Sequence, residues 1–127
     1  MFSEILLDHF QNPRNAGALA EPTACVEVSN PVCGDVLQLA VKIDANRIHD
    51  VKFLCRGCTA SIACASAATE IMRGSPVSSL KAITAQSLSG SLGGLPDASF
   101  HAAQLAEDAV KAMLAAVAKA SPSPTSE

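Results

Sequence analysis

The sequence predicts an α+β fold in which helices cover one face of a small three-stranded antiparallel sheet. Three segments alternate apolar and polar residues as strands do, at 24–29, 36–43 and 48–54. The polar run 44–47 joins the last two and is typical of a hairpin. A long C-terminal helix is expected over 101–119, where apolar residues recur every three or four positions.

Further helices are expected before and after the predicted strands in the sequence. Residues 3–11 have the apolar spacing of a short amphipathic surface helix, and breaker residues follow at 12–17. A second helix is predicted over 58–73, ended by Gly74, and its small residues would permit close packing. The Ser- and Gly-rich stretch 75–97 is expected to hold one or two short helices.

Length and composition indicate a single domain, residues 1–120, followed by a disordered Ser- and Pro-rich tail, 121–127. The chain has 127 residues, of which 49% are hydrophobic and 3% aromatic, so an aliphatic, alanine-rich core is expected. The chain has nine Lys and Arg and twelve Asp and Glu, and its basic residues form no run. This composition argues against nucleic acid as a partner.

Apolar residues never run together for the length of a membrane span, and acidic residues interrupt the apolar start of the chain. We therefore expect neither a membrane segment nor a signal peptide, and a cytoplasmic protein. An odd cysteine count, five, in such a chain favours reduced thiols with ligand or redox roles over a disulfide framework.

Candidate metal ligands lie in two loops and at the start of the long helix. Cys33 and Asp35 flank Gly34, which would let the backbone fold so that both side chains point the same way. Cys58 lies at a predicted helix start, where free N–H groups and the helix dipole favour a thiolate. His101 lies in the first turn of its helix, where we expect a neutral, ligating imidazole. Each residue also has an ordinary structural interpretation, but together they are sufficient for one four-coordinate metal.

The other cysteines are weaker candidates. Cys55 forms a Cys-x-x-Cys with Cys58, whose turn could close on a metal or form a disulfide. Dithiol redox catalysis is disfavoured because the second cysteine, not the first, begins the helix. Cys64 is six residues beyond Cys58, about 9 Å along a helix and on another face, so the two should not share an ion. We interpret Cys25 as a structural residue on a strand. His9 and His49 are interpreted as surface or partly packed residues.

The chain resembles the IscU and NifU N-terminal (SufU-like) family of iron–sulfur cluster assembly scaffolds over nearly its whole length. The similar segments are Ser3 to Phe10 with Asn12 to Asn15, Cys33-Gly34-Asp35, Gly57 to Ser61, and His101 with Leu105 to Ala109. The resemblance implies that Cys33, Asp35, Cys58 and His101 surround a cluster or a zinc ion. A third family cysteine, directly after the histidine, is Ala102 here, and Cys55 is the best candidate to replace it.

The resemblance implies a non-enzymatic scaffold or carrier for iron or a [2Fe-2S] cluster. Its expected partners are a cysteine desulfurase, a chaperone and apo iron–sulfur proteins, with a homodimer that shares a cluster left open. Two alternatives remain at this level. One is a zinc-containing sulfur-transfer partner of a desulfurase, with persulfide on Cys58 or Cys55. The other is a relative that binds zinc without assembling clusters.

Overall fold

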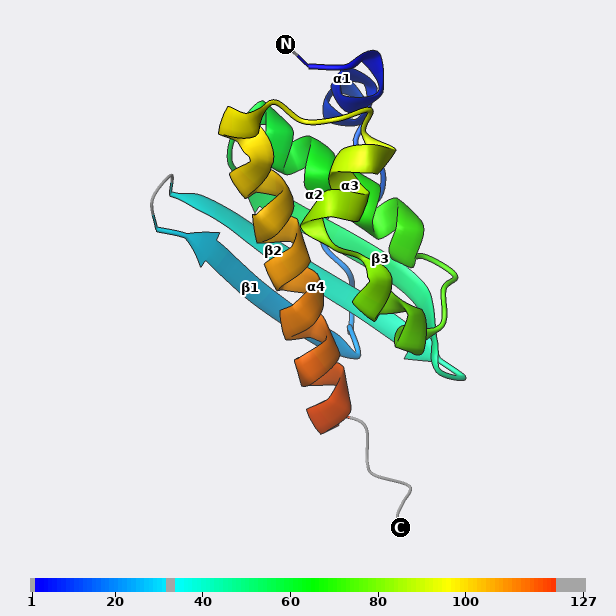
Figure 1. Cartoon of the computed structure of the whole chain (residues 1–127). Coiled ribbons are helices and arrows are strands. Elements are labelled where there is room, and N and C mark those ends of the chain that lie inside the picture. The colour runs from blue at the N-terminus through cyan, green and yellow to red at the C-terminus, as the bar shows by residue number, and fades with distance from the viewer. Residues whose placement is uncertain (1, 32–33, 121–127) are drawn as a thin grey trace.

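The computed structural model describes residues 2–31 and 34–120 (Figure 1). Its sheet contains β1 (Ala24–Asn30), β2 (Asp35–Asp44) and β3 (Arg47–Arg56), in the order β1-β2-β3 with both pairs antiparallel. The predicted sheet and its strands are confirmed, each strand one to three residues longer than the pattern indicated.

A tight hairpin joins β2 to β3. Ala45 and Asn46 connect the strands with φ angles of 53° and 63°, which is the backbone required by a two-residue turn with the twist of the strands. The pairing shifts by one residue at positions 42–43, and beyond this shift Leu39 pairs with Phe53 and Leu37 with Cys55. Leu37, Leu39 and Phe53 are all buried, so this face of the sheet belongs to the core.

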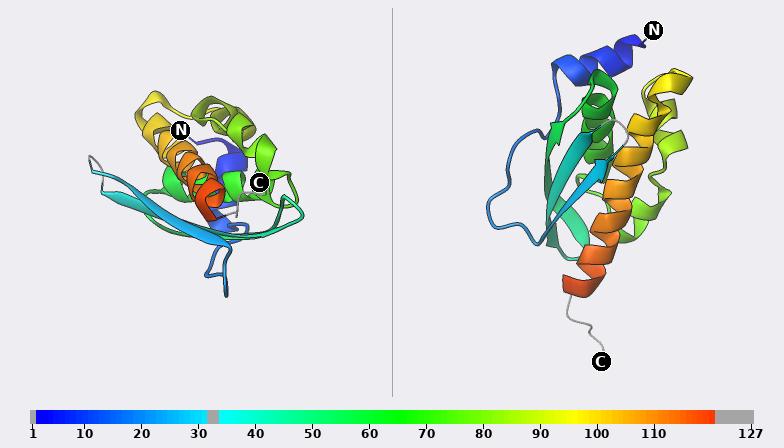
Figure 2. Two further views of the ribbon diagram at one scale, coloured as in Figure 1. Left: turned by 90° about the horizontal axis from the view of Figure 1, so that it is seen from below. Right: turned by 90° about the vertical axis from the view of Figure 1, so that its left-hand side faces the viewer.

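The helices lie on that buried face of the sheet (Figure 2). They are α1 (Glu4–Gln11), α2 (Thr59–Met72), α3 (Ala85–Ser91) and α4 (Phe100–Ala120), with short 3-10 turns η1 (Val77–Ala82) and η2 (Asp97–Ser99). The predicted covering of one face is confirmed. The stretch 75–97, predicted to hold one or two short helices, contains η1 and α3, and η2 begins at its last residue. Residues 121–127, predicted to be disordered, lie outside the described residues.

Helix α2 is the centre of the helical layer because it packs against α1, α4 and β3. Its residues are mostly small, and Ala63, Cys64 and Ser66 are completely buried. Small side chains let neighbouring backbones approach closely, which is how a core with few aromatic residues reaches a normal packing density. In residues 2–31 and 34–120, no helix combines the length and apolar character needed to cross a membrane.

The prediction that His9 is a surface or partly packed residue is wrong. Its side chain is buried, with Nδ1 2.8 Å from Ser66 Oγ and Nε2 3.5 Å from Glu70 Oε1. His9 shares a face of α1 with the buried Leu6, three residues earlier, and this face packs on α2. Ser66 gives the buried imidazole a polar partner. His49, by contrast, is exposed on β3 as expected.

Candidate metal centre

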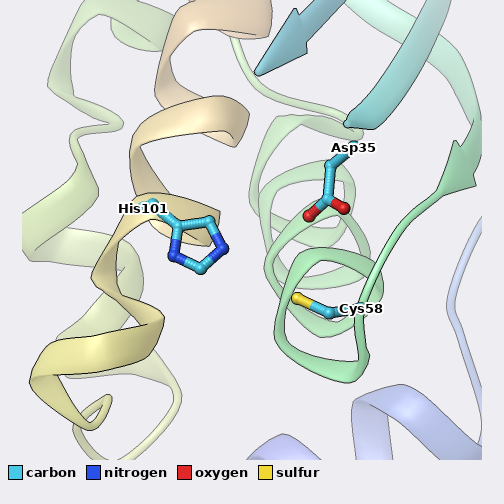
Figure 3. Close-up of side chains that lie close together, drawn as sticks. All are labelled: Asp35, Cys58 and His101. Carbon is cyan, nitrogen blue, oxygen red and sulfur yellow. The ribbon is translucent and has the colours of Figure 1, made fainter. Parts of the chain in front are cut away.

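Three of the four predicted ligands come together at one end of the sheet (Figure 3). One ligand atom each from Asp35, Cys58 and His101 lies within 4.8 Å of the other two. The side chains come from the first residue of β2, the residue before α2 and the first turn of α4. Ligands of one tetrahedral metal are about 3.3 to 3.8 Å apart when bonds are about 2.0 to 2.3 Å long, so small side-chain rotations suffice to close the site.

Asp35 is buried where β2 begins, beside the connection from β3 to α2. Its side chain is 6% exposed, and Ser61 Oγ donates a hydrogen bond to its Oδ2. Gly57 packs directly on the carboxylate, because a Cβ at this position would lie 2.8 Å from Asp35 Cγ and 3.1 Å from both oxygens. The absence of a side chain at position 57 therefore makes the space that the carboxylate occupies.

Cys58 is the N-cap residue of α2 and is exposed to solvent. Its backbone is extended (φ −79°, ψ 172°), and its carbonyl accepts the first helical hydrogen bond from Ile62 N at 3.1 Å. The thiol makes no capping hydrogen bond; its Sγ lies 3.3 Å from Ser61 Oγ. The sulfur is thus presented at the positive end of a 14-residue helix, a favourable place for a metal-bound thiolate.

His101 presents its imidazole from α4 across the site. Its Nδ1 is 3.1 Å from the carbonyl oxygen of Ala98. A carbonyl only accepts, so Nδ1 carries the hydrogen, and in a neutral ring the lone pair is on Nε2. Figure 3 shows the ring nitrogen farther from the backbone turned toward Asp35 and Cys58. This is the common arrangement of a metal-binding histidine.

Among the cysteines that the structure describes, only Cys58 belongs to this group. Cys33, the fourth predicted ligand, lies outside the described residues, so its role stays a prediction. Cys55 is partly buried; burial, with Asp35 and Cys58 adding, raises the pKa of its thiol to about 11. Cys64 is fully buried in the core, where burial raises its pKa to about 12. Cys25 is exposed on β1, as expected for a strand residue.

Sequence reasoning gave no role to Gly57 or Ser61, although both contact Asp35. A signal for Ser61 was present: it follows Cys58 by three residues at a helix start, the spacing at which N-cap and third-residue side chains meet. No comparable signal existed for Gly57, because its requirement comes from a carboxylate 22 positions earlier.

Comparison with known proteins agrees with the fold and the motifs. The family model for the NifU-like N terminal domain matches residues 1–121. Iron-sulfur cluster assembly scaffold protein IscU 1 of Archaeoglobus fulgidus is 42% identical over 111 residues, 87% of this chain and 72% of that protein. The IscU scaffold protein of Haemophilus influenzae is 41% identical over 118 residues, 90% of this chain and 93% of that protein.

A solved structure supports the same fold. The protein from Fervidobacterium islandicum, proposed as an iron–sulfur cluster assembly scaffold of the SUF system, superposes with a TM-score of 0.73 at 21% identity. The match covers 89% of this chain and 96% of that one. Taken with the family match over residues 1–121 and relatives above 40% identity, these findings show that the chain belongs to the IscU and NifU N-terminal family.

Proposed function

We propose that this protein is an iron–sulfur cluster assembly scaffold that holds iron or a [2Fe-2S] cluster as cargo at Asp35, Cys58 and His101. The observation that carries the proposal is the convergence of these three donors within 4.8 Å from distant parts of the chain. The names of its IscU relatives point to the same cargo. Cys33, two residues before Asp35 in the sequence, is proposed as the fourth ligand.

The donor set suits temporary binding. Thiolate sulfur is a soft ligand that selects iron–sulfur clusters, whereas a carboxylate and an imidazole bind iron less exclusively. Cys58 is exposed, so the cargo would lie at the surface where a recipient can reach it. Ala102 is 1% exposed, and its methyl group supplies no ligand in place of the family's third cysteine. A mixed shell of this kind should release a cluster more readily than four thiolates.

Anaerobic reconstitution with iron and sulfide tests the proposal. We expect visible absorption in the wild-type protein and its loss in Cys58→Ala and Cys33→Ala, with weaker or less stable absorption in Asp35→Ala and His101→Ala. The chain offers matched controls, since Cys25 and His49 are exposed on the sheet and away from this group. Cys25→Ala and His49→Ala should behave as wild type. Unchanged spectra in both Cys58→Ala and Cys33→Ala would rule out the proposed site.

Exposure of Cys58 also favours sulfur acceptance from a cysteine desulfurase, which we propose as a partner with apo iron–sulfur proteins as recipients. The Cys58 thiolate would attack the outer sulfur of the desulfurase persulfide. The sulfur–sulfur bond there breaks, the desulfurase thiolate leaves, and Cys58 carries the persulfide. Cys55 is less suited, because burial raises the pKa of its thiol to about 11 and keeps it protonated at neutral pH.

Mass spectrometry after incubation with a desulfurase and cysteine distinguishes these thiols. We expect an added sulfur of about 32 Da on the peptide that contains Cys58. The wild-type adduct should persist in Cys55→Ala and disappear in Cys58→Ala. An adduct on no cysteine would reject sulfur acceptance. Tight zinc without iron uptake would instead favour a zinc-binding relative that assembles no cluster.

A further inference from the structure

We propose that the outer edge of β1 binds an extended, basic segment of a partner protein as an added antiparallel strand. The inference goes beyond the proposed function, because it concerns a surface outside the metal centre and does not depend on whether the chain binds iron. It names the hydrogen bonds that hold the partner and the charge that the partner carries opposite Glu27.

The two outer edges of the sheet differ in how they are covered. The edge of β3 is protected, because Phe53 N donates to Asn15 O at 2.9 Å and Gly17 N donates to Phe53 O at 2.8 Å. β1 lies at the opposite side of the sheet, and α4 packs on its inner face (Figure 1). Among the residues that the structure describes, only β2 hydrogen-bonds to the backbone of residues 24–29. An uncovered edge strand is a template for pairing with another chain.

The hydrogen-bond pattern shows which backbone groups β1 offers to a partner. Consecutive residues of an antiparallel strand direct their N–H and C=O groups alternately to its two sides. Phe53 uses its groups on residues 15–17, so Leu39, its neighbour on β2, directs its own groups toward Val26 of β1. Three residues of β1 therefore direct their backbone groups away from the sheet, namely Cys25, Glu27 and Ser29. Each of them offers one N–H donor and one C=O acceptor at the outer edge.

Glu27 determines which extended segment fits this edge. It is the only charged residue of β1, its side chain is exposed, and it forms no ion pair within the described part of the chain. A second copy of β1 that used all the outward groups would pair Cys25 with Ser29 and place Glu27 opposite its own copy. Like charges directly opposite destabilise a strand pair, whereas a lysine or an arginine at that position is favourable. The edge therefore selects a basic segment over a second copy of the chain.

β1 also leads toward the metal centre, since its last residue, Asn30, is aligned with Asp35. Neighbouring strands are about 4.8 Å apart, so an added strand would run about 10 Å from β2. A segment bound along β1 would reach the end of the sheet where Asp35, Cys58 and His101 come together. This position suits a protein that delivers or receives the proposed cargo.

Two synthetic peptides of the length of β1, seven residues, test the charge requirement. Both alternate threonine and valine, are acetylated and amidated, and have either lysine or glutamate at the centre. We expect the lysine peptide to bind with a Kd about fivefold lower, and Glu27→Lys to reverse this preference. Glu4→Lys, on α1, makes the same change in net charge and should keep the wild-type preference. Equal Kd values for the two peptides, no binding of the lysine peptide, or an unchanged preference in Glu27→Lys would overturn the proposal.

Amide hydrogen exchange followed by NMR locates the bound peptide. The N–H groups of Cys25, Glu27 and Ser29 should become protected, whereas that of Phe53, which already donates to Asn15, should not change. Ser29→Pro removes one outward N–H and no bond to β2, a change that edge strands tolerate. It should weaken binding of the lysine peptide by about tenfold. Protection confined to other residues, or wild-type binding by a folded Ser29→Pro protein, would exclude strand addition at this edge.

Sedimentation velocity of the wild-type protein tests the competing occupant, a second copy of the chain. We expect a monomer, because pairing along the whole edge would bring two Glu27 side chains together. A wild-type dimer in which the N–H groups of Cys25, Glu27 and Ser29 are protected would show that a second copy occupies the edge, and would overturn the proposal.

Discussion

Gly57→Ala should weaken metal binding at the site by tenfold or more while the protein remains folded. The new Cβ would lie 2.8 Å from Asp35 Cγ, closer than such atoms approach, so the buried carboxylate must move away. Displacing a ligand or its support typically costs 10- to 100-fold in metal affinity. Gly57 is not among the glycines with positive φ, so alanine fits the backbone itself. Titration with Co²⁺ measures the metal affinity, and thermal melting followed by circular dichroism shows whether the protein remains folded.

Gly90→Ala is the matched control for this substitution. Gly90 lies in α3, has no positive φ, and a Cβ there would meet nothing within 4 Å. Alanine at this helical position should leave metal affinity unchanged and slightly stabilise the protein, by about 0.5 to 1 kcal/mol. Equal affinity in Gly57→Ala and Gly90→Ala would mean that the position of Asp35 does not matter for binding.

His9→Ala should destabilise the fold more than any exposed substitution, by about 2 kcal/mol in the free energy of unfolding. The change removes the 2.8 Å hydrogen bond to Ser66 and leaves a space between α1 and α2. For a chain of 127 residues, this corresponds to a melting temperature lower by about 7 °C. His49→Ala, on an exposed strand position, should melt within about 2 °C of wild type.

His9 should also make stability depend on pH. Burial lowers the pKa of the imidazole below its ordinary value, Arg14 lowers it further, and Glu70 and Asp8 oppose the shift. The unfolded chain therefore binds a proton more readily than the folded protein. The stability that the neutral His9 side chain contributes is fully present above the pKa of the unfolded state, about 6.5. It is lost as the pH falls through that value toward the lower pKa of the folded state. His9→Gln should flatten the stability profile between about pH 7 and 5. An unchanged slope in this variant would assign the pH dependence to other groups.

Local sequence patterns predicted the strands and the long helix because each signal lies within the element itself. Alternation in β2 and the polar connection at 44–47 sufficed to predict the hairpin. The one-residue shift in pairing at positions 42–43 has no such local signal and was not predicted. The burial of His9 could not be predicted in this way. Its partner Ser66 is 57 positions away, and no local pattern shows which face of α1 meets which residue of α2.

The sequence named the residues that the structure brings together, but it could not give their geometry, and their binding of a metal stays a proposal. Cys58 and His101 were placed at helix starts from local signals, and α2 and α4 begin there. That their donor atoms approach Asp35 depends on how β2, α2 and α4 pack, which is a property of the whole fold. The contacts of Ser61 and Gly57 with Asp35 follow from the same packing, so they could be identified only from the structure.

The most direct test of whether Asp35, Cys58 and His101 surround one ion is X-ray absorption at the zinc edge. Zn²⁺, which is redox-silent, serves as the probe and is bound to the full chain. We predict a mixed shell, with Zn–S distances of about 2.3 Å and Zn–N or Zn–O distances of about 2.0 to 2.1 Å. The imidazole contribution should be lost in His101→Ala, and a sulfur contribution in Cys58→Ala. A shell that is unchanged by both substitutions would show that the ion binds elsewhere and would contradict the account.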